Sequence, residues 1–178
     1  MKTLVIYTSQ TGFTKKYAEW ITEQMSADLM EFSEAKKKKN DFFAGYDAIV
    51  FGGWIMAGRT VKVNWFLSKA DLWKDKKLAV FCVGGSPEDN PDVDLTLKNM
   101  LTDEQRKYIR AFYCQGGFNY GKMNGPSRLA MKMFVSALKN KKDKTEDEKV
   151  MAEMIAKSYD ISDIKYTEPL ISYLKEAA

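Results

Sequence analysis

The fold is decided near the start of the chain, by the segment KTLVIYTSQTGFT (residues 2–14). Its first part, residues 2–8, is a short apolar run without strict alternation, which predicts a strand buried on both faces. A loop with several hydroxyl side chains follows at once, and residues 14–25 then carry apolar side chains at helical spacing between charges. A strand, a tight loop and a helix in this order form the first unit of a parallel α/β sheet.

Short apolar runs and helical patterns continue to alternate along the rest of the sequence. Further strands are predicted over 28–32, 46–53, 77–85 and 109–117, and further helices over 60–73, 91–107, 146–158 and 167–177. Thr145 and Glu148 have the spacing of a capping box, and Pro169 lies in the first turn of the last helix. Five strands alternating with helices predict a doubly wound sandwich, in which ligands bind beyond the carboxyl ends of the strands.

The composition limits the chemistry that the side chains can perform. The 178 residues, 45% of them hydrophobic, suit one domain with a real core, so we predict a single domain over 1–178. Histidine is absent, which excludes Ser-His and Cys-His nucleophile pairs and histidine-ligated zinc, and we expect no metal site. Cys82 and Cys114 lie in apolar runs and are predicted to be buried free thiols. Reactivity must therefore come from carboxylates, Lys, Tyr, Cys or a bound cofactor.

The charge pattern gives weaker information about partners and location. The net charge of +4 comes from scattered lysines mixed with acids, so we expect no nucleic-acid partner. The dense cluster Lys36 to Lys39 is either a solvated loop or a docking patch for an acidic partner or an anionic membrane. No leader segment and no apolar stretch of ~20 residues is evident, so we expect a cytoplasmic protein, with peripheral contact at the inner face of a membrane left open.

The loop after the first predicted strand is the strongest indication of a ligand. The amino terminus of a helix presents unpaired N–H groups and the positive end of a dipole, which together favour an anion. Ser9, Thr11 and Thr14 add O–H donors, and Gly12 allows close approach of the backbone. The loop lacks both the lysine of a P-loop and the three glycines of the dinucleotide fingerprint, so a phosphate monoester fits better. The alternative is an ordinary helix cap, for which one hydroxyl is enough.

Paired glycines at the ends of three predicted strands are a second indication. They lie at 52–53, 84–85 and 116–117. Such pairs either allow close approach to a ligand or simply make tight turns. Three pairs at the same edge of the predicted sheet favour a ligand site there.

The residues described so far resemble those of the flavodoxin family. Thr8 to Thr14 is similar to the family's FMN-phosphate loop, Ser/Thr-x-Thr-Gly-x-Thr, and GGWIMAGRT (52–60) and VGGSPED (83–89) are similar to its two ring-flanking loops. The resemblance implies an α/β, flavodoxin-like three-layer sandwich with a five-stranded parallel sheet in the order 2-1-3-4-5, and FMN as cofactor. The cofactor-binding residues that it implies are Thr8, Ser9, Gln10, Thr11, Gly12, Phe13, Thr14, Gly53, Trp54, Ile55, Met56, Ala57, Gly58, Val83, Gly84, Gly85 and Ser86.

Within the family, the chain resembles the menaquinone-dependent protoporphyrinogen oxidases and related flavodoxin-domain proteins. The likeness lies in Ile55 to Arg59, in Tyr120 after the fifth strand, in RLAMKMF (128–134) and in KKDKTEDEK (141–149). It implies an FMN-dependent oxidoreductase that transfers electrons or hydride between a reduced organic substrate, such as a porphyrinogen, and an acceptor such as a quinone. The alternative is a flavodoxin-type electron carrier that serves a redox partner protein, although such carriers are usually acidic.

The segment 119–144 distinguishes the enzyme interpretation from the carrier interpretation, because it extends beyond a minimal flavodoxin. Eight of the ten residues over 129–138 are apolar, and basic residues flank this run. A helix apolar nearly all round is either buried on its own domain or forms a surface for a membrane, a quinone or porphyrin, or a second subunit. Tyr120, Lys122 and Arg128 are our candidates for substrate contact. A phosphoryl-accepting regulator of similar topology is excluded, because the third strand ends without an aspartate.

Overall fold

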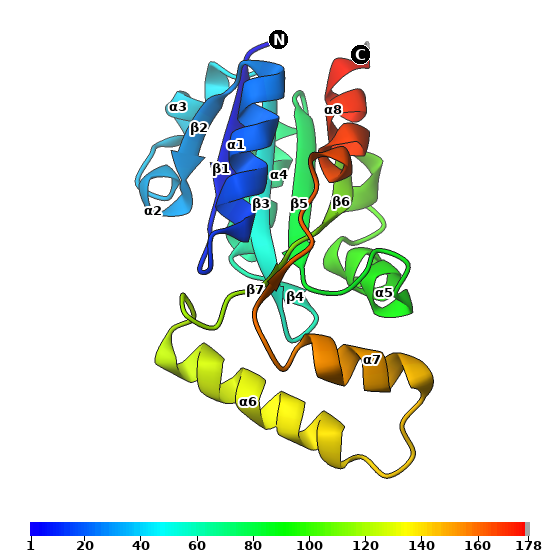
Figure 1. Cartoon of the computed structure of the whole chain (residues 1–178). Coiled ribbons are helices and arrows are strands. Elements are labelled where there is room, and N and C mark those ends of the chain that lie inside the picture. Colours follow the sequence, from blue (N-terminus) through cyan, green and yellow to red (C-terminus); the bar gives the residue numbers. More distant parts are fainter. Residues whose placement is uncertain (177–178) are drawn as a thin grey trace.

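The computed structural model describes residues 1–176, and the side chains of all of these except Asp147 and Met151 (Figure 1). Five parallel strands form the sheet in the order β2-β1-β3-β5-β6. They are β1 (Thr3–Tyr7), β2 (Asp28–Glu31), β3 (Ala48–Met56), β5 (Lys77–Gly84) and β6 (Ile109–Gln115). Counted along the chain this is the predicted order 2-1-3-4-5, so the predicted fold is confirmed. The sheet has one more strand than expected, the short β4 (Arg59–Thr60), which pairs antiparallel with the end of β3.

Helices cover both faces of the sheet, as the uninterrupted apolar strands predict. One face packs against α1 (Phe13–Met25) and α8 (Glu168–Lys175), and the other packs mainly against α4 (Val63–Ala70). Along β1, Leu4 and Ile6 belong to the hydrophobic core on the α4 side of the sheet. Val5 belongs to the core on the side of α1 and α8. This division follows from the strand geometry, because successive side chains point to opposite faces.

Smaller elements complete the two helical layers. On the α4 side lie α2 (Phe32–Ala35), α3 (Asn40–Ala44) and α5 (Pro91–Met100). The short 3-10 helices are η1 (Asp71–Trp73), η2 (Gln105–Lys107) and η3 (Ile164–Thr167). Since α5 ends at Met100 and η2 follows it, the helix predicted over 91–107 is broken into two parts. The N–H of Thr102 donates to Gln105 Oε1 (3.0 Å) and the N–H of Gln105 donates to Thr102 Oγ1 (3.2 Å), so a new turn starts there.

The chain leaves the sheet after β6 and returns before α8. The departing strand β7 (Gly117–Phe118) pairs antiparallel with the returning strand β8 (Tyr159–Asp160). Between them lie α6 (Gly125–Asn140) and α7 (Glu146–Met154), which extend past the carboxyl ends of the strands (Figure 1). None of the helices among the described residues is long and apolar enough to span a bilayer.

Sequence features explain where the outer helices begin. At α6, Asn124 Oδ1 accepts from the N–H of Ser127 (2.9 Å), with Pro126 in the first turn. At α7 the predicted capping box is present: the N–H of Glu148 donates to Thr145 Oγ1 (3.2 Å), and the N–H of Thr145 donates to Glu148 Oε2 (3.1 Å). The helix ends at Met154, four residues before the predicted end. The last predicted helix forms as α8, and its predicted final residue, Ala177, lies outside the described residues.

Candidate functional site

The loop between β1 and α1 is held by hydrogen bonds that its backbone N–H groups donate. The N–H of Thr8 donates to the carbonyl of Gly52 on β3 (2.9 Å), and the N–H of Gly12 donates to Ser9 Oγ (3.1 Å). Gly12 has φ 102°, a left-handed conformation that favours glycine, and its carbonyl accepts the first bond of α1 from Lys16 (3.0 Å). No side chain caps α1. The hydroxyls therefore do not form the ordinary helix cap that was the alternative, and the first N–H groups of α1 are left for a ligand.

A cation approaches this loop from outside it. The ammonium of Lys122 lies 3.9 Å from the position that a Cβ would occupy on Gly12. Lys122 and Lys16 line the same hollow beside the loop, together with Thr11 and Gly12. Lys16 forms an ion pair with Asp160, whereas no ion pair of the described residues includes Lys122. The sequence analysis placed Lys122 with the substrate, but its position suits a phosphate on the loop.

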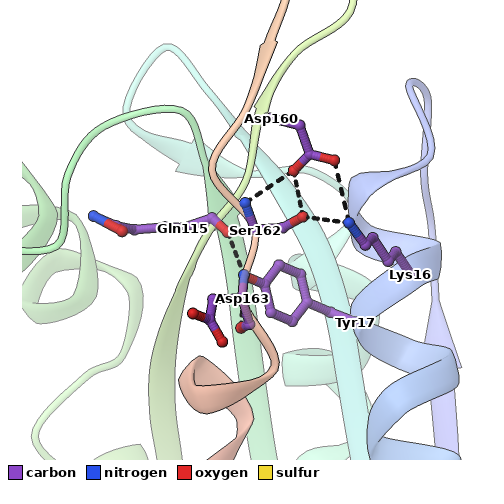
Figure 2. A network of polar contacts seen from close by, with 6 residues as sticks. All are labelled: Lys16, Tyr17, Gln115, Asp160, Ser162 and Asp163. Atoms are coloured by element: carbon purple, nitrogen blue, oxygen red, sulfur yellow. Dashed lines mark hydrogen bonds and ion pairs between the residues drawn. The ribbon is translucent and has the colours of Figure 1, made fainter.

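A polar network fixes the returning chain against α1 (Figure 2). Lys16 Nζ donates to Asp160 Oδ2 (3.1 Å) and to Ser162 Oγ (2.7 Å). Deeper in, Tyr17 Oη donates to the carbonyl of Gln115 and accepts from the N–H of Asp163 (3.1 Å). Partial burial acts to raise the pKa of Asp160, but hydrogen bonds from Ser162 and Lys16 outweigh it and lower that pKa. The network thus ties the segment after β8 to the helix that begins at the phosphate-type loop.

An apolar cavity of about 130 Å³ lies beyond this loop, where β3, β5 and β7 end. Trp54, Phe13 and Phe118 supply its aromatic side chains, and no described residue that lines it is charged. Ten of the seventeen predicted cofactor-binding residues line it: Phe13 and Trp54, together with Gln10, Thr11, Thr14, Ile55, Met56, Val83, Gly84 and Gly85. The cavity is therefore uncharged and suited to an aromatic ring.

Several predicted residues lie beside the cavity without lining it. Gly53 is buried within β3, where a Cβ would come within 2.7 Å of the carbonyl of Val61. Ala57 and Gly58 form the turn of the β3–β4 hairpin, with φ 49° and 71°. Two successive positive φ angles are typical of a tight hairpin turn, so 52–60 is a hairpin and not an open loop. Ser86 contributes its carbonyl, which accepts from Tyr113 Oη (2.7 Å).

The paired glycines make room for other parts of the same chain. A Cβ on Gly52 would overlap the ring of Phe81, and one on Gly117 would overlap the carbonyl of Tyr159. Two tyrosines then hold the loop after β5, because Tyr159 Oη donates to the carbonyl of Gly85 (2.6 Å) just as Tyr113 does to Ser86. Burial raises the pKa of both tyrosines, so each remains a neutral donor at physiological pH. Close approach at these glycines is thus internal packing.

The cysteines take no part in the site. Cys82 and Cys114 are free and buried, as predicted. Burial raises the pKa of the Cys82 thiol to about 12, against a smaller lowering by its hydrogen bond from Thr60, and burial also raises the pKa of Cys114. Since the thiolate is the nucleophile, neither thiol is reactive in the folded protein.

Residues of the outer segment complete the cavity, and none of them was among the predicted cofactor-binding residues. They are Gly117, Phe118, Met123, Ser127, Ala130 and Met131. The spacing of the last three along α6 places them on one side of that helix, which would have indicated a shared environment. The other two substrate candidates lie elsewhere: Tyr120 and Arg128 line a separate hollow between α6 and the residues after α7. Tyr120 Oη donates to the carbonyl of Ile155, so it tethers the outer segment at its base.

The comparison with known families agrees with this geometry. The profile of a family described as "Flavodoxin domain" matches residues 4–145, about four fifths of the chain. The chain belongs to the flavodoxin domain family. None of the curated proteins matches the sequence.

Solved structures of flavoproteins resemble this flavodoxin domain at low identity. A WrbA-like flavodoxin from Agrobacterium tumefaciens has 20% identity and a TM-score of 0.49, covering 71% of this chain and 87% of its own. A flavoprotein from Bacteroides eggerthii has 20% identity and a TM-score of 0.48, with 63% and 87% covered. A flavoprotein from Lactobacillus acidophilus, solved in complex with FMN, has 18% identity and a TM-score of 0.41, with 64% and 91% covered.

The residues present fit the cofactor that the flavodoxin resemblance implies. The free amino terminus of α1, the hydroxyls of Thr11 and Thr14 and the ammonium of Lys122 suit a phosphate monoester. The uncharged aromatic cavity suits a flavin ring, but about 130 Å³ is less than the roughly 300 Å³ of ordinary ligand pockets. Binding of a flavin ring would therefore require the cavity to widen, and Met123 and Met131 are the lining residues with the most flexible side chains.

Proposed function

We propose that this flavodoxin domain is an FMN-dependent oxidoreductase that passes electrons or hydride from a reduced organic substrate to an acceptor such as a quinone. The observation that carries the proposal is the pairing of an uncapped, hydroxyl-lined helix terminus with an uncharged aromatic cavity directly beside it. Family membership supports FMN as the cofactor. A cytoplasmic location and a single-domain organisation remain predictions of the same account.

The cofactor would supply the electron chemistry, and the chain's own residues have the task of binding and orienting it. Thr11, Thr14 and the first N–H groups of α1 would hold the phosphate, with Lys122 balancing its charge. Trp54 and Phe118 would contact the ring. No carboxylate, ammonium or thiol of the described residues lines the cavity, so the site offers no protein group for acid-base catalysis. That is the composition expected where the cofactor performs the reaction.

The identity of the substrate rests on resemblance alone. A porphyrinogen is the candidate that Ile55 to Arg59 and the outer segment favour, and menaquinone is the corresponding acceptor. Tyr120 and Arg128 do not line the cavity, so they would meet only a substrate that extends past α6.

The second candidate is an electron carrier without a small-molecule substrate. A carrier needs an exposed flavin edge, and here Ser127, Ala130 and Met131 of α6 line the cavity. This covering helix favours the enzyme.

Anaerobic mixing of the FMN-loaded protein with a porphyrinogen, followed by menadione, distinguishes the two candidates. An enzyme should bleach the flavin absorbance and recover it in repeated cycles, at a rate above that of free FMN. If the flavin absorbance bleaches and recovers only when a reductase protein is present, and the small molecule is not turned over, the result would contradict the enzyme function and support the carrier function.

A further inference from the structure

The outer face of α6 is apolar and open to solvent. Leu129, Met133 and Phe134 have exposed fractions of 61%, 65% and 51%. No described residue of α6 belongs to either hydrophobic core of the domain. Of the alternatives that the sequence left open, burial on its own domain is therefore wrong. These three residues are named here the apolar face of α6.

The position of α6 leaves this face free of the rest of the fold. The helix is the outermost element beyond the carboxyl ends of the strands (Figure 1). Ser127, Ala130 and Met131 line the aromatic cavity. Phe134 follows Ala130 at i+4, so it lies where the apolar face borders this cavity side. The apolar face therefore continues into the wall of the candidate flavin site.

Cations adjoin the apolar face, and α6 has no acidic residue. Arg128, Lys132 and Lys139 follow one another at i, i+4 and i+11, so they form one stripe along the helix. With Lys157 they line a hollow of about 680 Å³ that no described acidic residue lines. The Nε of Arg128 is buried without a hydrogen-bond partner, while its Nη2 donates to the carbonyls of Gly121 (3.3 Å) and Met123 (3.4 Å). The loop after α6 adds Lys142 and Lys144, with Asp143 between them.

We propose that α6 docks the protein on the surface of an anionic lipid bilayer. An apolar stripe flanked by Lys and Arg is the arrangement of helices that lie in the membrane interface, with apolar side chains among the acyl chains and cations at the lipid phosphates. The hollow beside Arg128 would receive such a phosphate. A second copy of the chain fits less well, because pairing of two α6 helices would bring the same cations together.

This inference goes beyond the proposed function, because it does not depend on bound FMN. It would locate the proposed reaction at the membrane surface, because a docked α6 would hold the aromatic cavity next to the lipid phase, where quinones dissolve. Apoprotein should dock as well as FMN-loaded protein, so failure of docking and failure of flavin binding are separate results.

Sedimentation with vesicles tests the proposal. The full chain should pellet with phosphatidylglycerol-containing vesicles at low salt and remain in solution with pure phosphatidylcholine vesicles. The variant Leu129→Ser/Phe134→Ser should bind roughly tenfold or more weakly, because two apolar side chains leave the lipid. Lys132→Glu/Lys139→Glu should bind at least about 25-fold more weakly, since each cation near an anionic surface contributes about fivefold.

Matched controls separate docking through α6 from general attraction. Leu72→Ser/Leu95→Ser removes two equally exposed apolar side chains outside α6 and should bind like the wild type. Lys36→Glu/Lys38→Glu changes the other basic cluster and should weaken binding much less than the α6 charge variant. Equal losses in both charge variants, or no vesicle binding at all, would overturn the proposal. So would a concentration-dependent dimer that only the apolar-face variant abolishes.

Discussion

The position of Lys122 leads to a prediction about the phosphate of FMN. Replacing Lys122 by Met removes the one cation near Gly12 that no described acidic residue neutralises, and it keeps most of the side-chain volume. Two unit charges about 4 Å apart interact by ~1 kcal/mol in water, and Lys122 is exposed, so the high-dielectric figure applies. A phosphate monoester carries up to two charges at pH 7. We therefore expect about 5- to 30-fold weaker FMN binding.

Flavin fluorescence titrations at two salt concentrations measure this effect. The loss should be largest at low ionic strength and should shrink in 0.5 M salt, since exposed charges are screened. Riboflavin, which lacks the phosphate, should bind the wild type and Lys122→Met equally, and Lys122→Arg should restore most of the FMN affinity. An equal loss of affinity for riboflavin would show that Lys122 shapes the ring site, and would refute the assignment to the phosphate.

Three further predictions concern the turn, the thiols and the polar network. Ala57→Gly relieves a left-handed alanine and should raise the free energy of unfolding by about 0.5–1 kcal/mol, which urea denaturation measures; a loss of stability would contradict the turn geometry. Native protein should leave Cys82 and Cys114 unlabelled by a thiol reagent until it is unfolded, because burial keeps both thiols protonated, and rapid labelling would contradict that burial. The pKa of Asp160 is lowered on folding, so its contribution to stability is present above the ordinary value near 3.8 and is lost as pH falls through the folded pKa. Asp160→Asn should therefore lower the urea midpoint at pH 7 and have less effect at pH 2.5, and a constant difference would count against the network.

The sheet could be predicted because local patterns determine its strands. Uninterrupted apolar runs locate β1 and β5, and both the α1 loop and the capping box at Thr145 depend on residues close together in the sequence. The continuation of β3 to Met56 and the short β4 were missed, since the glycines of this segment resemble those of a loop. Only the folded chain shows that Gly52 is small because Phe81 lies against it.

The rest of the site depends on contacts between distant parts of the chain. Lys122 is separated from Gly12 by 110 residues, and no local pattern brings them together. The same holds for Phe118 in the cavity wall and for the ion pair of Lys16 with Asp160. For α6, the sequence showed an apolar helix but not whether it was buried, because that depends on where β7 and β8 direct the chain.

An equilibrium titration of the purified apoprotein with FMN tests the central claim most directly. The account predicts saturable binding of one FMN per chain with a shifted flavin absorbance, clearly weaker binding of riboflavin, and a large loss of FMN affinity in Thr11→Val/Thr14→Val. A protein that takes up no FMN, or that binds FMN and riboflavin equally, would contradict it.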